Sequence, residues 1–361
     1  MRVVFFANPN SVHVRRWLQL AESAGIEIEG WSVERLGHTI GSNWKTAMAT
    51  GGAFRYAIAG LLMRLVPGSH TIVHAHSASG YGLMAWLSGR RYVLTVYGSD
   101  VYLARQRGLL YQKVLRKVLR RALLITCTTP AMREHLQTVY GIDAQRIRMF
   151  SLGIPLERFY LSIDERDRTR HALGFERATV ITSNRRMRAQ YRIDLIVRAF
   201  SVLSERDAGY RLILFEGDSE PGYVDAIARL ISDANLGENV VVVSGFRAPD
   251  EVRTYLAASD VVVSIPTSDQ MSAAILEALA CGATIVASPI EAYEELFRDD
   301  LAIPASVDSA EALADSIAKA AAIRASSETA SARTKEWLRQ TQSDDTVVGH
   351  VMEFYSGTSA L

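Results

Sequence analysis

The sequence predicts an α/β protein with two doubly wound domains, each a parallel sheet covered by helices on both faces. Three observations predict this class. The chain has 361 residues, and a length of about 150 residues per domain suggests two domains. Short, continuously apolar runs alternate with longer stretches of helical periodicity, which is typical of parallel strands buried on both faces. The alternation forms two series, separated by a charged segment.

The first series is assigned to an N-terminal domain, residues 1–160. Its first apolar run, Val3–Ala7, is too short for the core of a signal peptide and ends at Asn8-Pro9-Asn10, so it is interpreted as a buried strand. The other expected strands are Ile26–Trp31, Thr71–His74, Tyr92–Val96, Leu123–Cys127 and Arg146–Phe150. Amphipathic helices are expected at Val14–Ala24 and Leu109–Arg121.

The second series is assigned to a C-terminal domain, residues 161–330. The boundary is placed near Leu156–Arg170, where Leu161-Ser162-Ile163 leads into the charged run Asp164–Arg170. Its expected strands are Thr179–Thr182, Arg211–Phe215, Val240–Ser244, Val261–Ile265 and Thr284–Ala287. Its expected helices are Ile193–Glu205, Tyr223–Ala234, Asp250–Ala258, Ser272–Ala280 and Ala310–Ile323. The last segment, 331–361, has helical spacing over Ser331–Tyr355 and is expected to cross back to the first domain.

Composition excludes several classes of function. The 40 Lys and Arg residues are balanced by 39 Asp and Glu, which argues against a general nucleic-acid binder with a net basic surface. Cys127 and Cys281 lie far apart, so neither a disulfide framework nor a cysteine zinc site is expected. A reduced, cytoplasmic chain is expected instead. No run of about 18 apolar residues predicts a transmembrane helix.

The most informative stretch is residues 266–282, in which a strand ends in a short polar loop and a helix follows. Asp269 lies in the loop, and Glu277 lies about two turns further along. Two carboxylates so placed can hold sugar hydroxyls at two points of an extended ligand, with phosphate between them. The phosphate would meet the amides at the helix N-terminus, where the helix dipole favours an anion. These amides belong to Met271, Ser272 and Ala273.

This stretch resembles the acidic-x7-Glu motif of the retaining glycosyltransferases of family 4, which have the GT-B fold. Family members usually have Glu in the first position, and the Asp269 found here is typical of one branch. The resemblance extends over most of the chain, because seven further short motifs fall in the expected order. They are His13-x-x-Arg16-Trp17, Thr71–His76, Leu94–Asp100, Ser151–Phe159, Phe215–Asp218, Val243–Phe246 and Ser259–Val263.

The resemblance implies roles for the residues of this motif. Glu277 would bind the ribose hydroxyls of a nucleotide-sugar donor, and Asp269 would bind a hydroxyl of the transferred sugar. Arg185 and the helix amides would hold the diphosphate, since an Arg can bind phosphate through two hydrogen bonds. The alternative is that Asp269 is a loop residue and Glu277 an exposed helix residue.

A second basic residue is expected beside the diphosphate. Many relatives carry a Lys-Gly pair where this chain has Tyr191-Arg192, so Arg188 or Arg192 is expected to supply the charge. The alternative is that the arginines form a solvated charged run. The loops that contain Gly217 and Phe246 are also assigned to donor binding, although Gly217 could equally serve only as a turn residue.

The resemblance places the loop that follows Leu94 beside the reacting centre. Tyr97 stands where many relatives have His, and the adjacent Asp100 completes the expected motif, so both are assigned to the catalytic region together with Asp269. Acceptor or phosphate contacts are assigned to Asn10, Ser11, His13, Arg16 and His76.

Two alternatives stay open for the histidines and Arg16. His13 and Arg16 could serve only to orient the first helix. His74 and His76 lie on one face of a strand and could bind a metal ion, but no third ligand is near in the sequence.

The function implied is a retaining, metal-independent glycosyltransferase that moves a sugar from a nucleoside-diphosphate sugar to a hydroxyl acceptor, in polysaccharide or glycoconjugate biosynthesis. No cofactor is expected, and no metal ion, because the chain lacks an Asp-x-Asp anchor. The alternatives are a nucleotide-sugar epimerase of the same fold and a non-catalytic nucleotide-sugar-binding protein. The acceptor can be a glycan, a lipid-linked oligosaccharide or a small molecule.

The helix expected at Leu109–Arg121 carries a strongly basic face. Its cations can be an ordinary solvated face or a contact with an anionic membrane surface, which would place the protein peripherally at the inner membrane face. The cations are Lys113, Arg116, Lys117, Arg120 and Arg121.

Overall fold

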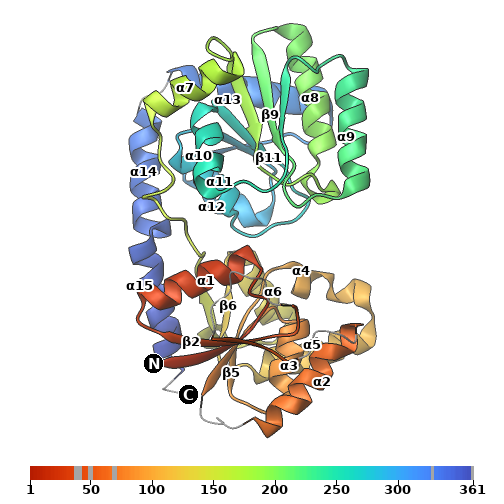
Figure 1. Ribbon diagram of the computed structural model, residues 1–361, viewed down its shortest axis with the longest axis vertical. Coiled ribbons are helices and arrows are strands. Elements are labelled where there is room, and N and C mark those ends of the chain that lie inside the picture. The colour runs from red at the N-terminus through yellow and green to blue at the C-terminus, as the bar shows by residue number, and fades with distance from the viewer. Residues whose placement is uncertain (36–42, 48–51, 67–70, 327–328, 359–361) are drawn as a thin grey trace. The chain divides into compact units, whose positions relative to one another are not determined.

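The computed structural model describes residues 1–35, 43–47, 52–66, 71–326 and 329–358. The chain divides into two compact units. The N-terminal unit comprises Met1–Leu152 and Asp344–Leu361, and the C-terminal unit comprises Gly153–Ser343. In each unit, helices cover both faces of one sheet (Figure 1).

The N-terminal unit contains a seven-stranded parallel sheet with the order β3-β2-β1-β4-β5-β6-β7. The strands are β1 (Arg2–Phe6), β2 (Glu27–Ser32), β3 (Trp44–Thr46), β4 (Ile72–His76), β5 (Tyr92–Thr95), β6 (Ile125–Cys127) and β7 (Ile147–Met149). The helices are α1 (Val12–Ser23), α2 (Arg55–Leu62), α3 (Gly80–Leu87), α4 (Ser99–Tyr102), α5 (Leu109–Arg121), α6 (Pro130–Tyr140) and α15 (Asp344–Ser356).

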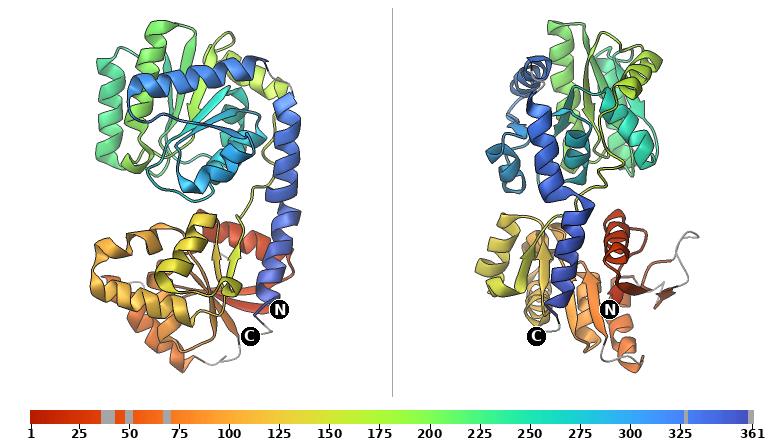
Figure 2. Two further views of the ribbon diagram at one scale, coloured as in Figure 1. Left: turned by 180° about the vertical axis from the view of Figure 1, so that it is seen from behind. Right: turned by 90° about the vertical axis from the view of Figure 1, so that its left-hand side faces the viewer.

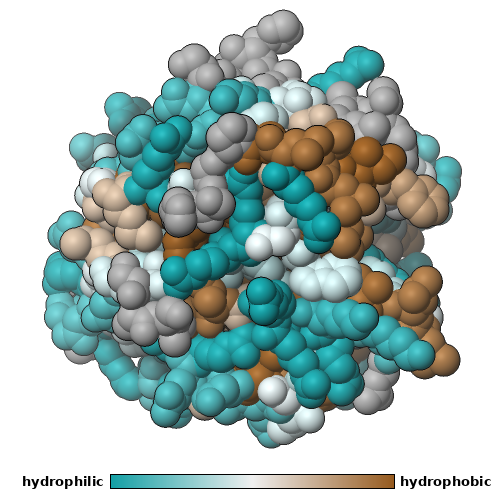
Figure 3. Space-filling view, turned by 90° about the horizontal axis from the view of Figure 1, so that it is seen from below, coloured by the Kyte–Doolittle hydropathy of each residue, from teal (hydrophilic) through white to brown (hydrophobic). Residues whose placement is uncertain are grey.

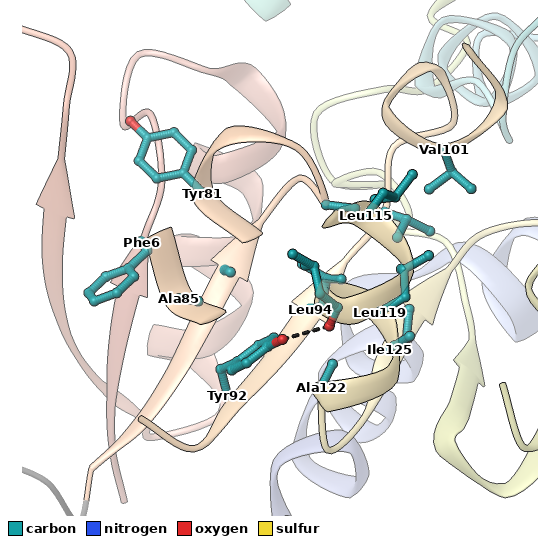
Figure 4. Close-up of a cluster of buried hydrophobic side chains, with 14 of the residues drawn as sticks. Phe6, Tyr81, Ala85, Tyr92, Leu94, Val101, Leu115, Leu119, Ala122 and Ile125 are labelled. Carbon is teal, nitrogen blue, oxygen red and sulfur yellow. Dashed lines mark hydrogen bonds between the residues drawn. The ribbon is translucent and has the colours of Figure 1, made fainter. Parts of the chain in front are cut away.

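Alternation along β1 separates the two cores of this unit. Val4 and Phe6 face the core formed with α2, α3, α5 and α6, whereas Val3 and Phe5 face the core formed with α1 and α15. Figure 4 shows part of the first core, where the Tyr92 hydroxyl donates to the Val118 carbonyl at 2.6 Å. This bond satisfies the one polar atom of a large side chain that is otherwise buried among apolar groups.

The C-terminal unit contains a six-stranded parallel sheet with the order β10-β9-β8-β11-β12-β13. The strands are β8 (Thr179–Ser183), β9 (Tyr210–Phe215), β10 (Val240–Val243), β11 (Val261–Ser264), β12 (Thr284–Ala287) and β13 (Ala302–Pro304). The helices are α7 (Ile163–Leu173), α8 (Ile193–Arg206), α9 (Pro221–Asp233), α10 (Pro249–Ala258), α11 (Ala273–Ala280), α12 (Glu294–Arg298), α13 (Ala310–Ser326) and α14 (Thr329–Gln342).

The predicted fold class is confirmed, with differences in detail. The charged run Asp164–Arg170, which the sequence places at the boundary, lies within α7 of the C-terminal unit. Arg166 and Arg170 each pair with Asp260 at 2.5 Å, so charge rather than an apolar stripe holds this helix on its sheet. The single C-terminal helix expected from the sequence is two helices, α14 and α15.

The second of these, α15, returns to the N-terminal unit, as the sequence predicts, and packs on α1 (Figure 2). Its buried residues, Val347, Val351, Phe354 and Tyr355, complete the core around Trp17. Across the described residues, no helix combines the length and the apolar character needed to cross a membrane.

Candidate functional site

The C-terminal unit presents its polar residues at the carboxyl ends of β8 and β11. β8 is the first strand of this unit and pairs with β9 on one side and β11 on the other, so the strand order reverses here. Ligands of open α/β sheets bind at the carboxyl ends of the strands beside such a reversal. Arg185 follows β8 and Asp269 follows β11, which brings residues 84 apart in sequence into contact.

Arg185 and Asp269 form a mostly buried ion pair. The Arg185 side chain is 8% exposed, and its Nη2 lies 2.8 Å from Oδ2 of Asp269. Its other terminal nitrogen donates to the Ser272 hydroxyl, and its guanidinium lies over the Tyr191 ring, 4.1 Å from the centroid. These contacts fix the guanidinium beside the N-terminus of α11.

Asp269 is oriented from two further directions. The Tyr293 hydroxyl donates to its Oδ2 at 2.7 Å, and the backbone amide of Gln270 donates to Oδ1 at 2.9 Å. Sequence reasoning missed Tyr293, which only the fold brings to the motif. It placed Tyr191 where many relatives have Lys, but it did not predict that the Tyr191 ring stacks on Arg185.

The N-terminus of α11 leaves polar groups without partners. Ser272 is the N-cap residue, and its carbonyl accepts the amides of Ile275 and Leu276 at 3.1 Å, so the preceding amides of the helix have no intrahelical acceptor. Among the described residues, the buried Oγ of Ser183 and Oδ1 of Asn184 also have no hydrogen-bond partner. Buried polar groups without partners are uncommon, and two of them beside the exposed amides of a helix N-terminus indicate a ligand site.

Glu277 lies within α11 and interacts with the positive charge of Arg185. Burial raises its pKa to about 7, although the charge of Arg185 opposes the shift. The side chain is partly exposed, and no group in the described part of the chain donates a hydrogen bond to its carboxylate. A carboxylate with a perturbed pKa and an open hydrogen-bonding capacity is typical of binding and catalytic sites.

This environment predicts a pH-dependent stability difference for Glu277→Gln. The folded pKa lies above the usual value of 4.5, so the folded protein loses stability as Glu277 deprotonates with rising pH, and the variant does not. We expect the melting temperature of the variant, relative to the parent, to increase between about pH 5 and about pH 8. Thermal melts without ligand test this, and a constant difference across that range would contradict the assigned environment.

Arg188 and Gly217 lie together at the edge of this region. Arg188 donates to the backbone carbonyl of Asp218 at 2.8 Å and to its carboxylate at 2.6 Å. Gly217 has a φ of +61°, and a Cβ there would approach Arg186 Cγ to 3.0 Å, so the turn favours glycine. Arg192, the alternative source of a second positive charge, donates to the Val307 carbonyl at 3.0 Å instead.

Phe246 lies beyond the carboxyl end of β10, directly after Gly245, which has a φ of +73°. Its side chain is 78% exposed. An exposed aromatic ring at this edge of the sheet offers a flat apolar surface on which a planar ring can stack.

In the N-terminal unit, the strand order reverses between β1 and β4, and the predicted residues gather near the carboxyl ends of β1, β4 and β5. His76 Nδ1 lies 2.9 Å from the Tyr97 hydroxyl, and the exposed His13 ring lies 5.3 Å from the Tyr97 ring. His76 is buried, and burial lowers its pKa to about 3, so the ring is neutral at neutral pH. His76 therefore positions the hydroxyl of Tyr97, and Tyr97 itself is partly exposed.

Asp100 joins the loops that follow β4 and β5. Its Oδ2 accepts the amide of Ala78 at 2.6 Å, and its Oδ1 accepts the amide of Tyr97 at 3.0 Å. Burial raises the pKa of Asp100, and these hydrogen bonds oppose the shift. The carboxylate is thus a positioning group for the Tyr97 loop.

Arg16 contacts the two points at which the chain leaves and re-enters the N-terminal unit. Its Nε donates to the Leu152 carbonyl at 3.0 Å, and its Nη1 donates to Asp344 at 3.2 Å. These contacts fit the alternative in which Arg16 orients the first helix, because they hold α1 against the start of α15.

The remaining candidates of this unit lie near the start of α1. Asn10 donates through its side chain to the Arg35 carbonyl at 3.1 Å, and Ser11 is the N-cap of α1. His74 has both ring nitrogens in hydrogen bonds, with Tyr355 at 2.5 Å and Thr95 at 2.8 Å, which leaves neither free for a metal ion.

Comparison with known proteins assigns both units. Residues 165–337 match the family of glycosyl transferases group 1, and residues 15–158 match Glycosyltransferase Family 4. Each unit thus matches a glycosyltransferase family model over most of its length. The first range contains the Arg185–Asp269 pair and Glu277. The second range contains His76, Tyr97 and Asp100, but it begins after His13.

Curated relatives of these glycosyltransferase domains are distant. A D-inositol 3-phosphate glycosyltransferase from Rhodococcus opacus is 27% identical over 64% of this chain and 56% of its own length. Mannosylfructose-phosphate synthase from Agrobacterium fabrum is 27% identical over 48% of this chain and 39% of its own length. The chain thus matches about half the length of these relatives.

Solved glycosyltransferase structures match nearly the whole chain. Anabaena Alr3699/HepE in complex with UDP superposes with a TM-score of 0.81 at 16% identity, covering 99% of this chain and 100% of that one. Sucrose-phosphate synthase from Thermosynechococcus elongatus gives a TM-score of 0.84 at 16% identity, covering 100% and 99%. At this identity the likeness supports the fold, which is GT-B.

Proposed function

We propose that the protein is a retaining glycosyltransferase that transfers a sugar from a nucleoside-diphosphate sugar to a hydroxyl acceptor. The observation that carries this proposal is the group at the N-terminus of α11, where the Arg185–Asp269 pair and unpartnered polar atoms adjoin Glu277. Positive charge, the backbone amides at the start of α11 and an open carboxylate match the phosphates and hydroxyls of such a donor.

In this proposal the diphosphate leaves against fixed positive charge. Arg185 is already oriented by Asp269, Ser272 and Tyr191, so it needs little reorganisation as negative charge develops on the leaving group. The first amides of α11 add a second set of donors. Glu277 accepts from the ribose hydroxyls, and Phe246 offers a stacking surface for the base.

Asp269 is proposed to accept from a hydroxyl of the sugar that moves. The acceptor attacks from the face of the leaving group, and the departing phosphate takes the acceptor proton, so no side chain acts as a covalent nucleophile. The Tyr97 hydroxyl, held by His76 and by the Asp100 loop, is proposed to contact the acceptor together with His13.

UDP is bound by one structural neighbour, and UDP-glucose by the same protein in another crystal. Uridine donors are therefore the first to test here, with GDP- and ADP-sugars as comparisons. Thermal stabilisation reports binding directly, since a ligand at 100 times its dissociation constant adds about 2.7 kcal/mol of stability.

Because Arg185 and the α11 amides supply the positive charge, we predict that transfer needs no divalent ion. Release of nucleoside diphosphate, measured with excess EDTA, is expected at the rate measured without it. Activity that is lost on chelation and restored by Mg²⁺ or Mn²⁺ would contradict this mechanism.

A further inference from the structure

Positive charge is concentrated in one part of the chain, although the formal net charge is only +1. Residues 35–133 contain 14 Lys and Arg and a single acidic residue, Asp100, which is buried. This segment lies entirely in the N-terminal unit. The N-terminal unit therefore contains a strongly cationic segment, although the chain as a whole is nearly neutral.

The exposed face of α5 carries five of these cations. No carboxylate in the described part of the chain forms an ion pair with any of them. Leu109 and Leu110, at the start of the helix, are 75% and 77% exposed. The cations are Lys113, Arg116, Lys117, Arg120 and Arg121, and together with Leu110 and Trp86 they line a shallow pocket.

A stripe of exposed apolar side chains runs along α2 and the short 3-10 helices at its ends, Gly52–Phe54 and Met63–Leu65. Successive members are four, three, one and three residues apart, so they share one side of the helix, while Ala59 and Met63 face the core. Phe54 and Leu65 are each 80% exposed. The stripe consists of Phe54, Ile58, Leu61, Leu62 and Leu65.

The apolar stripe and the cationic helix lie on the same side of the sheet. Both α2 and α5 contact α3, and α5 also contacts β5 directly through the Tyr92–Val118 hydrogen bond. Figure 3, which views the molecule from below, shows apolar side chains gathered beside hydrophilic ones. Exposed apolar side chains gathered on one side of a helix mark interaction surfaces.

We propose that this α2–α5 face, defined by the stripe and the five cations of α5, docks on an anionic lipid bilayer. A bilayer offers both chemistries in adjacent layers, because its headgroups attract Lys and Arg and its acyl boundary accepts Leu, Ile and Phe. A nucleic acid would match the cations but would leave the stripe exposed. The docking places the N-terminal unit at a membrane surface.

Co-sedimentation of the full chain with vesicles tests the proposal. We expect binding at low salt to vesicles that contain phosphatidylglycerol, and none to vesicles of phosphatidylcholine alone. The triple variant Lys113→Glu, Lys117→Glu, Arg121→Glu is expected to bind at least about tenfold more weakly. It spares Arg116 and Arg120, which donate to the carbonyls of Val139 and Tyr140.

A matched control carries the same change of charge elsewhere. Arg198→Glu, Arg229→Glu and Lys319→Glu replace exposed cations on helices of the C-terminal unit. This triple should bind vesicles as the parent does. Equal loss in both triples would show that net charge alone governs binding, and would overturn the assignment to α5.

The apolar stripe has its own test. Phe54→Ser, Leu61→Ser and Leu65→Ser together should retain binding at low salt and lose it as salt screens the remaining electrostatic attraction, whereas the parent stays bound longer. Circular dichroism and thermal melts confirm that each variant folds. An unchanged salt profile would indicate a purely electrostatic polyanion surface and overturn the bilayer proposal, as would a parent that ignores anionic vesicles at low salt.

Discussion

Arg185→Ala is expected to lower turnover by about two to three orders of magnitude, the range seen when a preorganised donor to a developing oxyanion is removed. The guanidinium is mostly buried, stacked on Tyr191 and bonded to Asp269 and Ser272. The other two candidate cations are engaged elsewhere, since Arg188 pairs with Asp218 and Arg192 donates to the Val307 carbonyl. Turnover under saturating donor, measured by release of nucleoside diphosphate, tests this expectation.

The same substitution removes one partner of a buried ion pair, so it should also destabilise the C-terminal unit, by about 3–5 kcal/mol if Asp269 stays charged. Arg166→Ala is the matched control, because Arg166 pairs with Asp260 at the opposite ends of the strands. The control should lose stability but keep its turnover at temperatures where it is folded. Arg185→Lys should recover part of the stability and little of the rate, because Lys lacks the planar fork.

Substitutions of the two carboxylates, Glu277 and Asp269, are expected to change different quantities, donor affinity in the first case and turnover in the second. Glu277→Gln should weaken donor binding by about 1.5–3 kcal/mol, the loss expected for a hydrogen bond to a charged group. Asp269→Asn should lower turnover more than donor affinity, because its contact with the moving sugar strengthens as the bond breaks. Donor titrations and saturated rates on both variants separate the two effects.

Stability controls differ for the two carboxylates. Asp269→Asn breaks the pair with Arg185 and should melt below the parent, whereas Glu277→Gln should not, because its carboxylate has no partner to lose. Rates are therefore compared at a temperature where all proteins are folded. Near-normal kinetics in both variants would remove the proposed site.

Much of the fold could be predicted because buried parallel strands are continuously apolar. All eleven strands expected from the sequence are present within a few residues. β3 and β13 were not predicted, since each has three residues at a sheet edge and leaves little pattern. α7 was misassigned as a boundary because its one buried residue is Arg170, so a charged pair replaces the apolar periodicity that identifies a helix.

The candidate site was predictable to the extent that it depends on strand ends. Arg185 and Asp269 meet because both follow neighbouring parallel strands. Tyr293 lies 24 residues beyond Asp269, and Arg16 meets Asp344 across 328 residues, so no local spacing signals these contacts. Only the fold distinguishes a predicted ligand-binding arginine from one that holds two helices together.

The central claim is that a nucleotide-sugar donor is bound and cleaved at the N-terminus of α11. The most direct measurement is release of nucleoside diphosphate from UDP-, GDP- and ADP-sugars without acceptor, by the parent and by Arg185→Ala. The proposed function predicts slow release from at least one donor by the parent, and its loss in the variant at a temperature where the variant is folded. Donors that stabilise the parent without any release, or release that is equal in the two proteins, would contradict it.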